Sequence, residues 1–295
     1  MKVLVTGGSG FIGSHVVEEL RKQEYQPVIF DHVARGSTDY LGDIRDSTAV
    51  TEAFSSVDAF IHLAGILGTP ECLQNPRPAV ETNILGGLNV LEAAAQYKVP
   101  GVCIGVGNHF MQNTYSITKS TIERFVKMYN AERGTRINVV RAMNAYGPRQ
   151  TPAAPYGPSK VRKIAPSFIC RALRGDPIEM YGDGSQVSDM VYVTDVAKAL
   201  VRAMNYATLS GGAFDRVVEV GPKEHNTVRQ IAETVKEITG STSEIVSLPP
   251  RPGEQNGAVV CADTSTLKLV GMRAKDLVPL REGLEKAVQY YRGVA

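Results

Sequence analysis

The sequence lacks the usual signs of a metal site, a disulfide framework or a membrane protein. Its four cysteines lie far apart and form no C-x-x-C pair, so we expect free thiols in a reducing compartment. Its five histidines show no spacing typical of metal ligands, and no metal site is expected. No apolar run approaches the length of a membrane span, and a strand-like run begins at Lys2, so no signal peptide is expected either. We therefore expect a cytoplasmic protein.

The chain also lacks an excess of charge of one sign. Its net charge is +2 over 295 residues, with 21% charged and 43% hydrophobic residues, which is ordinary for a globular protein. This balance gives no reason to expect nucleic acid or a membrane surface as a partner. The length allows one large domain, or a large domain with a smaller one.

Glycine, in contrast, is concentrated near the start of the chain. Residues 2–6 predict a short apolar strand, and residues 7–13 read GGSGFIG, which contains G-x-G-x-x-G. A helix-like run follows to about residue 22, and a second strand ends in Asp31. The glycine string alone would indicate only a tight turn. With a strand before it, a helix after it and an acid at this distance, it predicts a dinucleotide-binding turn.

Each part of this stretch suits a dinucleotide. Glycines take the tight turn, let the backbone approach a pyrophosphate and let the helix lie close to the sheet. The N–H groups at the start of the helix favour an anion. Asp31 lies eighteen residues past Gly13, where a carboxylate would accept bonds from the adenosine ribose and repel a 2′-phosphate. This predicts NAD rather than NADP.

The first half of the chain alternates strand-like and helix-like runs. Strands are predicted at 2–6, 27–31, 58–65, 101–106 and 136–141, and helices at 47–55, 78–97 and 114–133. The alternation predicts an α/β fold, a Rossmann-type doubly wound parallel sheet over residues 1–150.

The pattern changes after residue 146. Residues 146–163 hold six prolines or glycines, which is typical of a functional loop or lid. Shorter elements follow, with helices near 165–174, 194–206, 227–239 and 280–292 and a strand at 217–220. We expect residues 151–295 to form mostly a smaller C-terminal lobe that binds the substrate, parts of which complete the sheet.

Tyr115 and Lys119 form a Y-x-x-x-K pair on the predicted helix 114–133. Residues i and i+4 share a helix face, and a lysine ammonium beside a phenol should lower the pKa of the tyrosine. Such a tyrosine can take or give a proton while hydride moves to or from nicotinamide. The pattern alone recurs by chance on surface helices. Its place after the strand 101–106, at the carboxyl edge of the sheet, favours a catalytic role.

Together with these features, further blocks give the chain a resemblance to the extended short-chain dehydrogenases/reductases, within the NAD-dependent nucleotide-sugar epimerase/dehydratase family. The resemblance covers essentially the whole chain. The matching blocks are TGGSGFIG at 6–13, GDI at 42–44, HLAG at 62–65, Asn83, RAMNAYGPRQ at 141–150, YGDGSQ at 181–186, YVTDV at 192–196 and RPGE at 251–254.

The resemblance implies roles for individual residues. Those that would bind NAD are Gly7, Gly10, Phe11, Ile12, Gly13, Asp31, His32, Asp43, Ile44, Leu63, Ala64, Gly65, Tyr115 and Lys119. Asp43 and Ile44 would contact the adenine, although an Asp near a helix start followed by a core Ile explains them equally well. Tyr115 would be the acid/base and Lys119 its partner. The substrate's diphosphate and nucleotide would be bound by Asn144, Arg251 and Glu254. We add Arg162 to these substrate residues from its charge and its place in the Pro/Gly-rich loop, not from the resemblance.

Two positions depart from the family pattern. Relatives end the strand before the catalytic tyrosine with a Ser/Thr cluster. Here the expected position falls on Gly107 or Asn108, and Asn108 lies only seven residues before Tyr115. Asn108 is our first candidate to replace the hydroxyl, with His109 and Thr114 as alternatives. Relatives also often carry arginine where Ser188 stands. Arg162, Lys163 or Arg149 would then compensate.

These features favour a nucleotide-sugar 4-epimerase that works through a transient 4-keto sugar. A 4,6-dehydratase, a sugar-acid decarboxylase and a dehydrogenase or reductase of the same family remain alternatives, and so does a non-catalytic NAD-binding sensor. The resemblance also implies a homodimer through the helices at 78–97 and 114–133, although their apolar residues would equally suit the core.

Overall fold

The computed structural model describes residues 1–34, 38–255 and 257–294. Its centre is a seven-stranded sheet in the order β11-β6-β5-β4-β1-β2-β3, in which every pair of neighbours is parallel. The strands are β1 (Lys2–Thr6), β2 (Gln26–Asp31), β3 (Tyr40–Leu41), β4 (Ala59–His62), β5 (Gly101–Val106), β6 (Ile137–Ala142) and β11 (Val218–Val220). The predicted doubly wound parallel sheet is confirmed.

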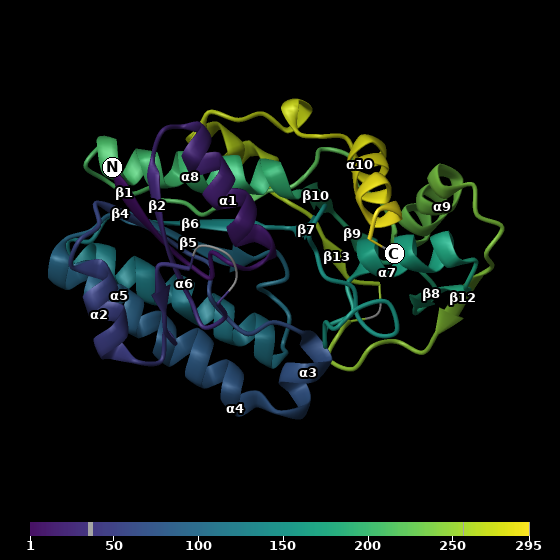
Figure 1. Ribbon diagram of the computed structural model, residues 1–295, viewed down its shortest axis with the longest axis horizontal. Coiled ribbons are helices and arrows are strands. Elements are labelled where there is room, and N and C mark those ends of the chain that lie inside the picture. The colour runs from purple at the N-terminus through teal and green to yellow at the C-terminus, as the bar shows by residue number, and fades with distance from the viewer. Residues whose placement is uncertain (35–37, 256, 295) are drawn as a thin grey trace.

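Helices cover both faces of this sheet (Figure 1). On one face lie α1 (Phe11–Lys22) and α8 (Val193–Leu209), and on the other α2 (Ser47–Phe54), α5 (Gly87–Tyr97) and α6 (Thr114–Arg133). Each face has its own apolar core, one built around Val16, Leu20 and Leu200 and the other around Phe60, Leu91 and Val126. Because apolar side chains cover both faces, the sheet's carboxyl edge is the part left to bind ligands.

A single helix was predicted over residues 78–97, and this prediction was wrong in detail. The run begins earlier and has three parts, namely α4 (Pro76–Ala79), a π-helical segment η1 (Val80–Gly86) and α5. The wider π turn contains the buried Asn83. Its side-chain amide bonds both the N–H and the carbonyl of Ile66, at 2.8 and 2.9 Å. The π turn therefore ties this helix to the loop after β4.

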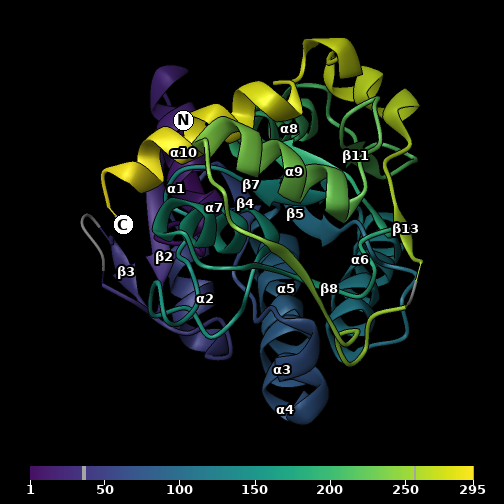
Figure 2. The same ribbon diagram turned by 90° about the vertical axis from the view of Figure 1, so that its right-hand side faces the viewer.

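The second lobe is built on α7 (Ile164–Arg174), α9 (Val228–Thr239) and α10 (Leu280–Arg292), which lie side by side in Figure 2 around a third apolar core. Three two-stranded parallel sheets accompany them. They are β7 (Asn144–Tyr146) with β10 (Met190–Tyr192), β8 (Ile178–Tyr181) with β12 (Ile245–Leu248), and β9 (Val187–Ser188) with β13 (Val259–Val260). α8 and β11 lie between these elements in sequence and pack with the large sheet.

The remaining short helices are α3 (Thr69–Gln74) and the 3-10 segments η2 (Thr264–Val270) and η3 (Ala274–Asp276). In the described part of the chain, no helix is long and apolar enough to cross a membrane. The cysteines Cys72, Cys103, Cys170 and Cys261 are free thiols, as expected.

Candidate active site

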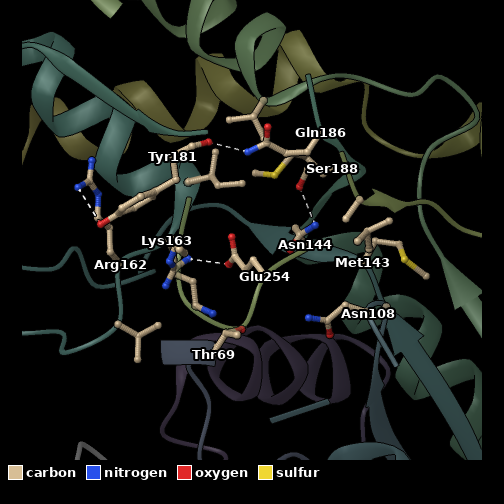
Figure 3. A pocket seen from close by; sticks show the side chains of 18 of the residues that line it. Thr69, Asn108, Met143, Asn144, Arg162, Lys163, Tyr181, Gln186, Ser188 and Glu254 are labelled. Carbon is tan, nitrogen blue, oxygen red and sulfur yellow. Dashed lines mark hydrogen bonds and ion pairs between the residues drawn. The ribbon is translucent and has the colours of Figure 1, made fainter. Parts of the chain in front are cut away.

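A cavity of about 720 Å³ lies where the two lobes meet, at the carboxyl ends of β5 and β6. Its walls come from the start of α1, the loop before α3, the start of α6, the start of α7, and the loops that follow β8 and β12. Figure 3 shows polar side chains from both lobes directed into it. The predicted site residues that line the cavity are Phe11, Ile12, Asn108, Tyr115, Asn144, Arg162, Arg251 and Glu254. The other predicted residues lie outside this lining, in the glycine turn and the start of α1, at the ends of β2, β3 and β4, and on α6.

The glycine turn has the close approaches that the motif requires. Gly7 has a φ of +73°, and a Cβ on it would lie 2.8 Å from the backbone nitrogen of Ala64. A Cβ on Gly13 would collide with the carbonyl oxygen of Gly7. Gly10 precedes α1 and provides no side-chain cap to its free N–H groups. The glycines let this turn pack tightly against the end of β4 and the start of α1, which leaves the N–H groups of the helix start open to an anion. The cradle therefore fits the pyrophosphate of a dinucleotide.

Asp31 lies at the end of β2, next to this turn. Its carboxylate is 7% exposed and accepts bonds from the N–H groups of Ser9, at 3.0 Å, and Val33, at 3.2 Å. The exposed His32 places its Nδ1 3.2 Å from Oδ1 of the same carboxylate. Each carboxylate oxygen accepts more than one bond, so the ribose role predicted for Asp31 fits its position.

Asp43 and Ile44 are already engaged within the protein. Arg45 binds the Asp43 carboxylate through Nε and Nη2, the latter at 2.6 Å, which lowers the pKa of this acid. Ile44 is 4% exposed and packs against Gly86, where a Cβ would lie 2.8 Å from it. The structure thus gives Ile44 the core role that we weighed as an alternative. The adenine contact stays a prediction.

The end of β4 packs under the glycine turn. The N–H groups of Leu63 and Ala64 lie 3.3 and 3.4 Å from Thr6 Oγ1, which also bonds His62 Nδ1 at 2.7 Å. Burial and the nearby Lys119 lower the pKa of His62 to about 3, so the imidazole stays neutral in the core. Gly65 follows, and a Cβ there would lie 2.8 Å from Asn83 Oδ1 and 3.9 Å from Lys119 Nζ.

Tyr115 and Lys119 stand on the first two turns of α6. The helix is capped by Asn113, which accepts the N–H of Ser116 at 3.0 Å. Tyr115 lines the cavity, whereas Lys119 is buried behind it towards Gly65. Burial raises the pKa of Tyr115 and lowers that of Lys119. The predicted lowering of the tyrosine pKa is therefore wrong for the ligand-free chain, because burial disfavours the phenolate and Lys119 is not among the groups that shift this pKa.

Another side chain fills the place of the missing hydroxyl. A Cβ on Gly107 would collide with the sulfur of Met143, so the thioether fills the place of a serine or threonine side chain. The neighbouring Asn108 lines the cavity, and its amide lies 3.7 Å from Met111 Sδ. Thr69 also lines the cavity and lies below Lys163 and Glu254 in Figure 3. Neither Met143 nor Thr69 was singled out from the sequence.

The groups predicted to bind substrate also line the cavity. Asn144 Nδ2 donates to Ser188 Oγ at 2.8 Å. Arg251 pairs with Glu254 at 3.2 Å, and burial raises the pKa of this acid. Arg162 is less available than expected, because it donates to the carboxylate and the backbone carbonyl of Glu179, at 2.7 and 2.9 Å. The structure thus brings these residues to one cavity but leaves the Arg162 guanidinium bound within the lobe.

Comparison with known proteins identifies the class. The model of the NAD dependent epimerase/dehydratase family matches residues 3–215, and the chain belongs to this family. The family is NAD-dependent, and the relatives that this chain resembles include UDP-sugar epimerases and decarboxylases. In the described residues, no group of three or more His, Cys, Asp or Glu side chains is placed to hold a metal ion.

The similar proteins include enzymes named for different reactions. A crystal structure of UDP-glucose 4-epimerase from Thermotoga maritima with UDP-glucose is 30% identical, covers 99% of both chains and gives a TM-score of 0.88. The UDP-glucose 4-epimerase of Thermus thermophilus, in complex with NAD, is 30% identical over the full length of both chains, with a TM-score of 0.84. A UDP-N-acetyl-alpha-D-glucosaminuronate decarboxylase from Bacillus cytotoxicus is 28% identical over 99% of this chain and 98% of its own length.

Proposed function

We propose that the protein is a nucleotide-sugar 4-epimerase with tightly held NAD. The observation that carries the proposal is Tyr115, whose phenol lines a large cavity at the sheet edge, with the buried Lys119 one turn behind it. Bound NAD supplies the hydride acceptor and donor. Tyr115 Oη takes the proton of the C4 hydroxyl as C4 is oxidised and returns it when hydride adds to the opposite face of the 4-keto sugar.

The other residues bind and orient the substrate. Arg251 faces the diphosphate, since a guanidinium matches phosphate oxygens with two parallel bonds. Asn144 presents its amide to the same wall, held in place by Ser188. Asn108 faces the sugar in place of the lost hydroxyl. Asn83 fixes the loop after β4 and also donates to Oγ1 of Thr118 at 3.0 Å. Because Thr118 directly precedes Lys119 on α6, this hydrogen bond sets the position of the lysine.

The charge of the cavity wall favours a neutral sugar over a sugar acid. Three cationic side chains line it, Arg162, Lys163 and Arg251, and three carboxylates line it as well, Glu179, Asp183 and Glu254. The diphosphate already brings two negative charges to this balanced wall. A sugar carboxylate would add a third, which supports epimerisation of a neutral hexose over decarboxylation of a uronic acid.

Product analysis separates these reactions. The purified protein would be given UDP-glucose, UDP-galactose and UDP-glucuronate without added NAD, and the products read by NMR. We expect inversion at C4 of the neutral sugars. Release of carbon dioxide from UDP-glucuronate, with no change in the neutral sugars, would favour the decarboxylase. A dehydrated product would favour the 4,6-dehydratase.

We also propose that two copies pair through the layer of η1, α5 and α6. Apolar side chains are exposed there, with Leu85 at 54% and Ile117 at 51%. We expect Leu85→Asp with Ile117→Asp to convert a dimer to a monomer, because each buried carboxylate would lack a partner. Sedimentation measures the mass. Leu209→Asp, on α8 across the sheet, is the control that should stay dimeric, and a wild-type monomer would contradict the proposal.

A further inference from the structure

The cations of the cavity wall differ in their partners. Arg162 is bound by Glu179, and Arg251 is paired with Glu254. Both guanidinium groups also lie over the ring of Tyr181, at 5.0 and 5.3 Å. The ammonium of Lys163 has no hydrogen bond and no ion pair with any described residue, although its side chain lines the same cavity (Figure 3). One cationic group on this wall is therefore uncommitted.

The backbone around Lys163 favours an anion as well. Lys163 is the residue before α7, and Ile164 and Ala165 from the first turn line the cavity with it. No side chain caps this helix start, and no acidic residue lies in the first turn. The free N–H groups and the positive end of the helix therefore add to the lysine charge.

Ser188 stands where relatives often carry arginine, and its hydroxyl is used by Asn144. The other two candidates for a compensating cation, Arg149 and Arg162, are excluded by their contacts. Arg149 points to α1 instead, where Nη2 donates to His15 at 2.6 Å and to Glu18 at 2.9 Å. Only Lys163, of the three cations considered from the sequence, faces the cavity without a partner among the described residues.

We propose that Lys163 binds the diphosphate of the substrate and that substrate affinity depends on the protonation of this one side chain. The inference rests on the proposed function. Besides Arg251 and Glu254 from the loop after β12, the charged or titratable groups near Lys163 are Glu71 and Cys72 of α3.

The pKa of the Lys163 ammonium lies in a pH range in which ligand affinity can be measured. Burial and the nearby Arg251 lower its pKa to about 8, against the opposing effect of Glu71 and Glu254. Below this pH the side chain is charged before the ligand arrives. Above it, binding must take up a proton, so the affinity falls by about tenfold per pH unit until the pKa of the complex is reached. An arginine at the same place would stay charged throughout.

UDP is a direct probe of this site, because its binding requires no turnover. Calorimetry from pH 7 to 9 measures its affinity. The terminal phosphate of UDP titrates near pH 6, below this range, and the uracil N3–H titrates above it. We expect the wild-type affinity to fall above pH 8. Lys163→Met should weaken binding at pH 7 by about ten- to a hundredfold and flatten the profile. Lys163→Arg should bind at pH 7 and also show a flat profile.

Lys160→Met is the matched control, since Lys160 is exposed on the same loop and does not line the cavity. It should keep both the affinity and the profile of the wild type. The proposal is overturned if Lys163→Met binds as tightly as the wild type, if Lys163→Arg keeps the falling profile, or if the wild type shows no fall or no UDP binding. If the pH profile of UDP affinity depends on Lys163 but the protein epimerises no sugar, the proposed function is contradicted and the proposal for Lys163 stands.

Discussion

Tyr115→Phe is expected to lower kcat by about 10²- to 10⁴-fold, because the variant loses the group that carries the proton of the C4 hydroxyl. The ring remains and the glycine turn is untouched, so the purified variant should still contain NAD. Turnover is measured by NMR of the sugar nucleotide. NAD content is measured by absorbance after the protein is denatured.

Tyr97→Phe serves as the control for this experiment. Tyr97 is the last residue of α5, is 39% exposed and lies outside the cavity, so its hydroxyl should have no effect on kcat. Turnover of Tyr115→Phe within about tenfold of the wild type would be incompatible with the acid/base role, which predicts at least a hundredfold loss. Loss of NAD together with turnover would instead indicate damage to the cofactor site.

Arg141→Met is expected to lower the free energy of unfolding by about 3–5 kcal/mol. Arg141 of β6 donates to Glu123 of α6 through Nη2 at 2.6 Å and to Glu219 of β11 through Nη1 at 2.9 Å. Both carboxylates are largely buried, with 6% and 15% of their side chains exposed. Without the guanidinium, two buried acids would lack their cation. Because this network fixes α6, which carries Tyr115, activity should fall with stability.

Denaturation in urea measures this loss. Arg141→Met combined with Glu123→Gln should recover part of it, because a buried amide needs no counter-charge. Arg273→Met is the surface comparison, since the Arg273–Asp276 pair is exposed on both sides and should contribute less than about 1 kcal/mol. An Arg141→Met variant as stable as Arg273→Met would mean that the buried network contributes little.

Much of the fold could be predicted from the sequence because its signals are local. The strand of residues 101–106 is a buried apolar run, and the helix of residues 114–133 ends at Gly134 with a positive φ, as a C-terminal glycine favours. The π segment at 80–86 gave no such signal, since it depends on Asn83 reaching the backbone of Ile66. The paired strands of the second lobe have two to four residues, too few for a pattern of alternation.

The candidate site was predictable where a motif fixes the spacing. Glycine contacts and the place of Asp31 follow from short-range geometry. The raised pKa of Tyr115 could not be predicted from the sequence, because the burial of this side chain depends on the second lobe and on α3, which lie far from it in sequence. Met143 was missed, since only the folded chain shows that it fills the space beside Gly107. Lys163 was one of three candidate cations, and only its surroundings separate it from the other two.

The central claim is that Tyr115 and bound NAD reverse the configuration at C4. Only the C4–H bond is broken, and the same hydride restores it within the site. The deciding measurement is the product analysis carried out in D2O with a neutral UDP-sugar and no added NAD. The account predicts a C4-inverted product with no deuterium on carbon. Deuterium on the sugar ring, or loss of water from it, would show proton abstraction at a neighbouring carbon and contradict the account.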